Sequence, residues 1–230
     1  NRLPMPEDLK MQIPLIREII SAYNIKVMEK DGFEADDIIA TLSRRAAKQN
    51  FEVIIVTSDK DMLQLIDSRI RVYNPYKDEG KYFTDKEVEE EFGVNPKGIV
   101  DLLSLMGDSV DNIPGVKGIG GKTASQILKE FKDIDRLLNN IDKIKSQKLR
   151  DLIRENKETI ILSRDLAKLP DDLKIDFKLE DFNLREPDFS KLYEIFKKLE
   201  FKSLLKKLEN KFQENKPQNN LEFLRNIKEI

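Results

Sequence analysis

The segment FEVIIV, residues Phe51–Val56, is the feature that most restricts the possible folds of this chain. It is short, continuous and apolar, and four of its six residues are β-branched. This pattern predicts a strand buried on both faces of a parallel sheet. The strand runs directly into TSDKD, residues Thr57–Asp61. Because ligands bind at the carboxyl ends of strands in open α/β sheets, we expect Asp59 and Asp61 to lie at a functional edge.

Apolar spacing predicts helices around this strand. A helical pattern begins after Pro6 and another follows Gly32, and a short strand is expected between them at Ile25–Met28. A further strand is expected at Ile70–Asn74, and Phe189–Leu208 predicts one long amphipathic helix. The fold class is therefore α/β, with a mostly parallel central sheet flanked by helices and followed by a helical subdomain.

Three acidic clusters contain the residues best suited to chemistry. The clusters GFEADD, TSDKD and GDSVD supply seven carboxylates: Glu34, Asp36, Asp37, Asp59, Asp61, Asp108 and Asp111. Ionised carboxylates crowded into one cleft repel each other, so their convergence is normally tolerated only when hard cations neutralise them. Two Mg²⁺ or Mn²⁺ ions about 4 Å apart would do so and would act on a phosphodiester. For any single cluster, a stabilising role at a helix N-terminus or in a turn stays open, but the three together favour a metal-dependent nuclease.

Composition removes several other kinds of site. The 230 residues include no Cys and no His, which excludes disulfides, zinc fingers and His-based triads. The formal net charge is −2, but setting aside the seven clustered carboxylates, which carry −7, leaves +5 on the rest of the chain. Net charge therefore does not argue against a nucleic-acid partner. The chain has no apolar run of membrane-spanning length and no signal-like start, so we expect a soluble, cytoplasmic protein.

A glycine-rich stretch, GVKGIGGKTASQIL, follows the third acidic cluster. Its turns precede a helix expected at Thr123–Phe131, and exposed backbone amides with Lys117 and Lys122 are suited to phosphate. A P-loop is the rival interpretation, but the spacing before GKT is five residues instead of four, and Pro114 stands where a strand should end. An ordinary helix connection built from glycine also stays open.

The ordered motifs GFEADD, TSDKDMLQL and MGDSVDNIPGVKGIGGKTASQIL resemble the 5′ nuclease, or flap endonuclease-like, family found at the N-terminus of bacterial DNA polymerase I. The resemblance runs from about Arg2 to Leu208. It implies a PIN/flap-endonuclease-like core with a helix-hairpin-helix-type DNA-binding element. It also implies that the seven acids hold two Mg²⁺ or Mn²⁺ ions directly or through water. DNA contacts would come from Arg2, at the end of an arch region, and from Lys117, Gly118, Gly120, Gly121, Lys122 and Thr123. A K⁺ ion would be held by backbone carbonyls near Val116 and Ile119.

The resemblance further implies a structure-specific 5′-3′ exonuclease or 5′-flap endonuclease acting in DNA replication and repair. Its partners would be duplex DNA with a 5′ flap or nick and an RNA primer strand, with polymerase domains following. The protein would be monomeric and nucleoid-associated. Two alternatives from other classes are a DNA-binding module without catalysis and a phosphatase-like enzyme acting through the DKD motif.

The expected domain organisation has three parts. Residues 1–106 would form an N-terminally truncated nuclease core, residues 107–212 a helical subdomain, and residues 213–230 a linker and the start of a following domain. The helical part contains a basic run, Lys143, Lys145, Lys148, Arg150 and Arg154, which either follows DNA or forms a solvated helix face.

Overall fold

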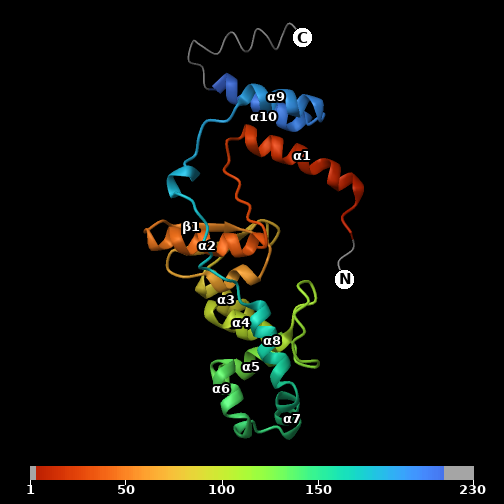
Figure 1. Ribbon diagram of the computed structural model, residues 1–230, viewed down its shortest axis with the longest axis vertical. Coiled ribbons are helices and arrows are strands. Elements are labelled where there is room, and N and C mark those ends of the chain that lie inside the picture. Colours follow the sequence, from red (N-terminus) through yellow and green to blue (C-terminus); the bar gives the residue numbers. More distant parts are fainter. Residues whose placement is uncertain (1–3, 215–230) are drawn as a thin grey trace. The chain divides into compact units, whose positions relative to one another are not determined.

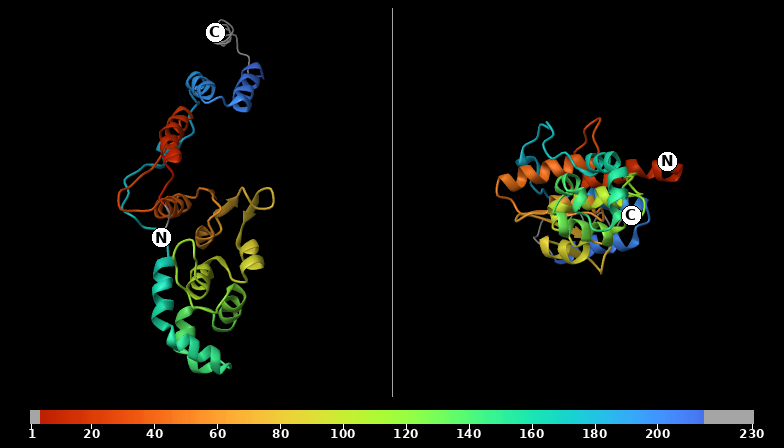
Figure 2. Two further views of the ribbon diagram at one scale, coloured as in Figure 1. Left: turned by 90° about the vertical axis from the view of Figure 1, so that its right-hand side faces the viewer. Right: turned by 90° about the horizontal axis from the view of Figure 1, so that it is seen from below.

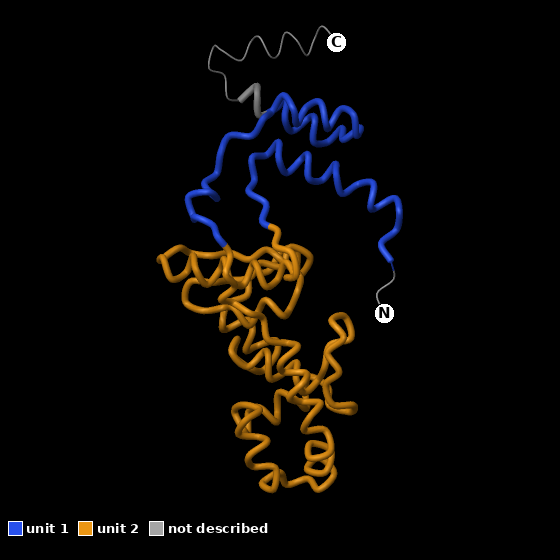
Figure 3. Tube along the Cα trace, in the orientation of Figure 1, with its two compact units in different colours: residues 1–28, 176–230 blue, residues 29–175 orange. Residues whose placement is uncertain are grey.

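The structure, a computed structural model, describes residues 4–214, with side chains described through residue 210. The chain divides into two compact units (Figure 3), one formed by residues 29–175 and the other by residues 1–28 with 176–230. The elements of the larger unit, seen in Figures 1 and 2, are α2 (Ala35–Lys48), β1 (Val53–Val56), η1 (Asp61–Leu65), β2 (Ile70–Asn74), β3 (Lys81–Phe83), α3 (Asp85–Phe92), η2 (Pro96–Gly98), α4 (Ile99–Met106), α5 (Gly121–Phe131), α6 (Ile134–Asn139), η3 (Ile141–Lys143), α7 (Gln147–Glu155) and α8 (Lys157–Ala167). Those of the smaller unit are α1 (Glu7–Ala22), η4 (Leu179–Phe182), α9 (Phe189–Lys198) and α10 (Lys202–Glu214).

The sheet of the larger unit has the strand order β1-β2-β3. Strands β1 and β2 are parallel, with Val56 opposite Tyr73, and β2 and β3 are antiparallel. The expected strands at FEVIIV and Ile70–Asn74 are therefore confirmed. The expected burial of β1 on both faces is wrong, because Ile55 is buried whereas Ile54 is 46% and Val56 is 64% exposed. The elements packed on β1 cover only the face that carries Ile55.

Helices form the rest of the larger unit. Helix α4 packs against both α5 and α8, and these contacts continue the apolar core that begins under the sheet. Leu102 and Leu105 of α4 meet this core together with Ile127 of α5 and Ile160 of α8, and all four are buried. Burying such side chains is favourable by roughly 1.5–3 kcal/mol each, so this packing gives the loops between the helices a rigid base.

The smaller unit is helical and has its own core. Ala22 packs with Leu192, Ile195, Phe196 and Leu208, which come from α1, α9 and α10. The expected strand at Ile25–Met28 is wrong: the backbone there forms no strand, and Ile25 and Val27 are exposed. No partner strand is present for it among the unit's described residues, which are otherwise helical or irregular.

The expected single helix over Phe189–Leu208 is also wrong, because the chain turns between α9 and α10. Glu200 has a φ of +56°, its N–H donates to the Lys197 carbonyl at 3.2 Å, and the Phe201 N–H donates to the Phe196 carbonyl at 2.9 Å. This is a Schellman motif, which ends α9 even though apolar residues continue at helical spacing.

Some expectations concern residues outside the described part of the chain. Arg2 and residues 215–230, which include most of the expected linker and following segment, lie outside the described residues. The domain boundaries expected from the sequence remain predictions. No helix in residues 4–214 combines the length and apolar composition needed to cross a membrane.

Candidate metal centre

A chain of short hydrogen-bonded turns places Asp59 and Asp61 at the end of β1. The Thr57 N–H extends the β1–β2 pairing by donating to the Tyr73 carbonyl at 3.0 Å. The Asp59 N–H then donates to Thr57 Oγ1 at 3.0 Å, and the Asp61 N–H donates to Asp59 Oδ1 at 2.9 Å. Helix η1 begins at Asp61, and its neighbours Met62, Leu63 and Leu65 are buried in the core. Asp61 lies next to these buried residues and is itself only 8% exposed.

The loop after α4 delivers Asp111 to the same place. Asp108 and Ile113 exchange two backbone hydrogen bonds, of 2.9 and 2.8 Å, which close the loop around Asp111. Gly115, with a φ of +58°, lies so close to Gly107 that a Cβ at Gly115 would be 2.2 Å from the Gly107 nitrogen. One carboxylate oxygen from each of Asp59, Asp61 and Asp111 can be chosen so that all three lie within 4.8 Å of one another.

The electrostatics of this cluster favour a cation. Burial, followed by the charges of Asp59 and Asp111, raises the pKa of Asp61 to about 7. Burial and then Asp59, Glu34 and Asp111 also raise the pKa of Asp36, which therefore shares the field of the cluster. Among the described residues, Asp61 Oδ1 and Asp108 Oδ2 are buried without a hydrogen-bond partner, but Asp108 Oδ2 forms an ion pair with the Lys60 ammonium, and no such pair is present at Asp61 Oδ1. An all-oxygen donor set with an unpartnered buried carboxylate oxygen fits a hard divalent cation.

Two of the remaining expected ligands, Asp37 and Asp108, have partners within the protein. At the start of α2, the Glu34 N–H donates to Asp37 Oδ2 at 3.2 Å, so Asp37 stabilises the helix N-terminus. Asp108 forms an ion pair with Lys60. Burial raises the pKa of Asp108, but contacts with the Lys60 ammonium and the Val110 N–H outweigh it, so the pKa lies below its ordinary value.

Two residues that the sequence did not single out contact the centre. Lys60 holds Asp108, and it lies between two metal-ligand candidates in the DKD motif, which is the only signal for it in the sequence. Gln64 Nε2 donates to the Asp61 carbonyl at 2.9 Å, and no local pattern indicates this contact. A pocket of about 150 Å³ lies beside Asp59 and Lys60, at the carboxyl ends of β1 and β2.

The glycine-rich stretch places an exposed helix start next to this centre in the chain. Helix α5 begins at Gly121, and Lys117 and Lys122 are exposed. A Cβ added at Gly118 or Gly120 would meet nothing within 4 Å, so the surface is open to a close-approaching ligand. The chain is anchored below by buried Val116 and Ile119, whose N–H donates to the Val116 carbonyl at 2.9 Å. The K⁺ site expected there remains a prediction.

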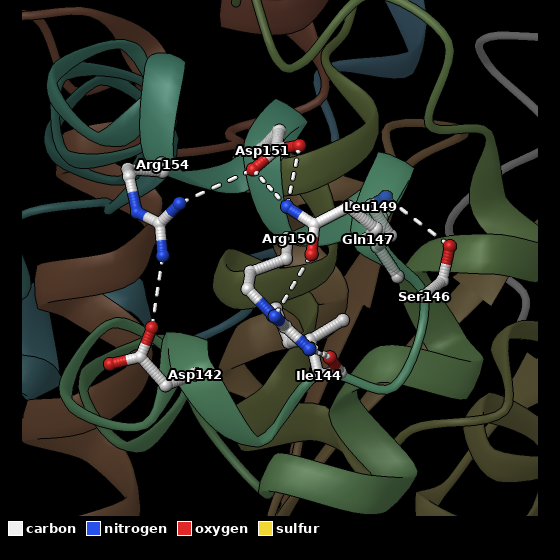
Figure 4. Close-up of polar contacts among 8 residues, drawn as sticks. All are labelled: Asp142, Ile144, Ser146, Gln147, Leu149, Arg150, Asp151 and Arg154. Atoms are coloured by element: carbon white, nitrogen blue, oxygen red, sulfur yellow. Dashed lines mark hydrogen bonds and ion pairs between the residues drawn. The ribbon is translucent and has the colours of Figure 1, made fainter.

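The two arginines of the basic run have structural partners (Figure 4). Arg150 donates twice to the Ile144 carbonyl, at 3.1 and 2.6 Å, and once to Gln147. Arg154 donates to Asp142 at 2.9 Å and to Asp151 at 3.2 Å. These contacts favour a structural role for the arginines, whereas the three lysines of the run are exposed.

Comparison with known proteins agrees with this arrangement. The sequence matches the family model for the 5′-3′ exonuclease N-terminal resolvase-like domain over residues 1–93 and that for the 5′-3′ exonuclease C-terminal SAM fold over residues 94–190. A 5′-3′ exonuclease of Aquifex aeolicus is 42% identical over 214 residues, which are 93% of this chain and 72% of that protein.

Two further similarities extend the comparison. DNA polymerase I of Bacillus caldotenax is 40% identical over 94% of this chain, which spans only 25% of that longer protein. A solved structure of the bacteriophage T5 flap endonuclease with DNA and metal ions has a TM-score of 0.57 and 23% identity, covering 62% of this chain and 52% of its own. The structural likeness concerns the fold, and the sequence matches carry the assignment: the chain belongs to the 5′-3′ exonuclease family.

Proposed function

We propose that this chain performs metal-dependent hydrolysis of phosphodiesters in DNA, as a 5′-3′ exonuclease or 5′-flap endonuclease. The observation that carries the proposal is the convergence of Asp59, Asp61 and Asp111, with a buried and unpartnered Asp61 oxygen. The T5 flap endonuclease, which shares the fold, was solved with DNA and metal ions. A site made only of carboxylates is suited to binding a hard cation.

The proposed cations are two Mg²⁺ or Mn²⁺ ions. Asp59, Asp61 and Asp111 would hold them together with Asp36, and Glu34, Asp37 and Asp108 would complete the sites directly or through water. When bound, such ions neutralise charge on phosphodiester oxygens and lower the pKa of water. The carboxylates orient the cations, and Lys60 supplies a fixed positive charge at Asp108.

The proposed DNA contacts lie on the glycine-rich stretch. Backbone amides at the start of α5 would face a backbone phosphate, and Lys117 and Lys122 would add point charges. Gly118, Gly120 and Gly121 would allow close approach, as the open space at the first two positions suggests. Thr123 and Arg2 would contribute further contacts, and K⁺ would bind carbonyls near Val116 and Ile119.

The proposed substrates are duplex DNA with a 5′ flap or nick and an RNA primer strand. Because several curated relatives are DNA polymerase I, we also propose that polymerase domains accompany this nuclease. It would act as a monomer in the cytoplasm, at the nucleoid.

The direct test is cleavage of a 5′-labelled flap duplex with and without Mg²⁺. Short products should require Mg²⁺ and should disappear in Asp59→Ala, with duplex binding retained. The matched control is Asp142→Ala, which removes an exposed acid and should cleave normally. Turnover by Asp59→Ala at high Mg²⁺ would contradict the proposal. Duplex binding without products from the unsubstituted chain would instead support the alternative, a catalytically inactive DNA-binding fragment.

A further inference from the structure

Helix α8 is attached to both segments that supply the carboxylate cluster. The first attachment is at Ser163, whose Oγ accepts a hydrogen bond from the Gly115 N–H at 3.0 Å. Ser163 is fully buried, so this contact is shielded from water. Gly115 closes the loop that carries Asp111, because it packs directly against Gly107 at the other end of that loop.

The second attachment is at the C-terminal end of α8 and is made by Gln64. Its Nε2 donates to the Asp61 carbonyl at 2.9 Å and to the Ala167 carbonyl at 3.0 Å. Its Oε1 accepts a hydrogen bond from the Leu169 N–H at 3.1 Å. The last carbonyls of a helix have no partners within the helix, and the Gln64 amide satisfies one of them at the end of α8. The same amide group also connects this helix end to the backbone of Asp61.

The two attachments lie close together along α8. Ser163 and Ala167 are four residues apart, which is about one turn of helix. The helix packs along α4, whose C-terminal end leads into the Asp111 loop (Figure 1). Asp61 and Asp111 are fifty residues apart in the sequence. Hydrogen bonds nevertheless connect the segments that carry them to the same turn of one helix.

We propose that α8 acts as a splint that sets the spacing between Asp61 and Asp111, with Gln64 and Ser163 as its positioning residues. Gln64 acts through the Asp61 carbonyl, and Ser163 acts through the Gly115 N–H. The inference rests on the proposed function, since the spacing matters only if the carboxylates hold a cation. Residues that orient metal ligands commonly affect cation affinity about 10–100-fold when they are removed.

The test measures binding of Mn²⁺ alone to the full chain by electron paramagnetic resonance. Gln64→Met and Ser163→Ala should each raise the Mn²⁺ Kd about tenfold. The double variant should raise it by less than the product of the two effects, because both act on the same spacing. The matched control is Thr41→Val, which removes a buried acceptor of the Leu173 N–H, at 3.2 Å, on the segment that follows α8. This control should lose stability and keep its Mn²⁺ Kd.

Hydrogen exchange of the metal-free protein gives a second, independent readout. Ser163→Ala should speed exchange in residues 107–119, Gln64→Met in η1 and at Leu169, and Thr41→Val only near Leu173. If the unsubstituted chain binds no Mn²⁺, the proposed function fails, and the exchange pattern alone then decides whether α8 holds both segments. Unchanged Kd values in both splint variants, an equal Kd increase in Thr41→Val, or exchange unaffected at residues 107–119 and in η1 would each overturn the splint.

Discussion

Replacing Asp61 with Asn should stabilise the metal-free protein at neutral and higher pH. The folded-state pKa of Asp61 is about 7 against an ordinary value of 3.8, chiefly because the side chain is buried. A raised carboxyl pKa means that stability is lost as the pH rises from the unfolded-state pKa through the folded-state pKa. At pH 8 the penalty is fully present, and about three pKa units correspond to roughly 4 kcal/mol. At pH 5 the stability penalty at Asp61 is smaller, about 2 kcal/mol.

Urea denaturation in the presence of a chelator measures the stability of Asp61→Asn relative to the unsubstituted protein. The gain in unfolding free energy of Asp61→Asn over the unsubstituted protein should be larger at pH 8 than at pH 5. Asp142→Asn, which changes an exposed carboxylate, should show no gain at either pH. Saturating Mg²⁺ should reverse the order at pH 8, because only the carboxylate form gains the full free energy of cation binding. A gain independent of pH, or a loss at pH 8, would refute the assignment of an unsatisfied charge at Asp61.

Three further predictions concern the surroundings of the centre. Replacing both Lys117 and Lys122 with Ala should reduce the slope of log K for duplex binding against log salt concentration by about two units. Replacing Lys145 and Lys148 with Ala should leave this slope unchanged. An equal effect of both pairs would indicate that the basic run also follows DNA. Lys60→Met should lower the unfolding free energy by about 2–3 kcal/mol in urea denaturation, because Asp108 stays buried without its cation, and Lys60→Arg should retain most of it. Gly115→Ala should lower the free energy of unfolding by about 3 kcal/mol or more, because φ is +58° and the new Cβ would lie 2.2 Å from the Gly107 nitrogen. Gly120→Ala has open space around it and should change the free energy of unfolding by less than about 0.5 kcal/mol. Thermal unfolding of the two variants gives the comparison.

The parts of the fold that local patterns determine were predictable from the sequence. The strand at FEVIIV is specified by β-branched residues, and the helix after the glycine-rich turns is specified by its periodicity. The break between α9 and α10 was not predictable, because it depends on a Schellman motif at Glu200, a residue with no intrinsic preference for positive φ. The exposure of Ile54 and Val56 was likewise hidden, since an apolar run indicates a strand without stating which elements cover it.

The candidate site was predictable as a meeting of segments but not as a division of roles. The position of Asp59 and Asp61 after a strand, and of Asp111 in a glycine-bounded loop, indicates convergence, and the structure brings these three together. The partners of the acids could not be predicted, because they depend on contacts between distant residues. Lys60 reaches Asp108 across forty-eight positions, and Gln64 reaches Ala167 and Leu169 across more than a hundred.

The seven acids differ in whether the protein itself satisfies their charge, and this difference is what sorts them. The Asp37 carboxylate accepts the Glu34 N–H at a helix start, and the Asp108 carboxylate faces an ammonium group, so each is stable without an added ion. Asp61 has a buried oxygen without a partner, and the charges of Asp59, Asp111 and Asp108 add to burial in raising its pKa. Burying a charged oxygen without a hydrogen-bond partner lowers the stability of the fold, and polar neighbours at this position would have avoided that cost. Since a bound divalent cation would return that stability, the unsatisfied carboxylate at Asp61 marks the centre of the site more sharply than the number of acids does.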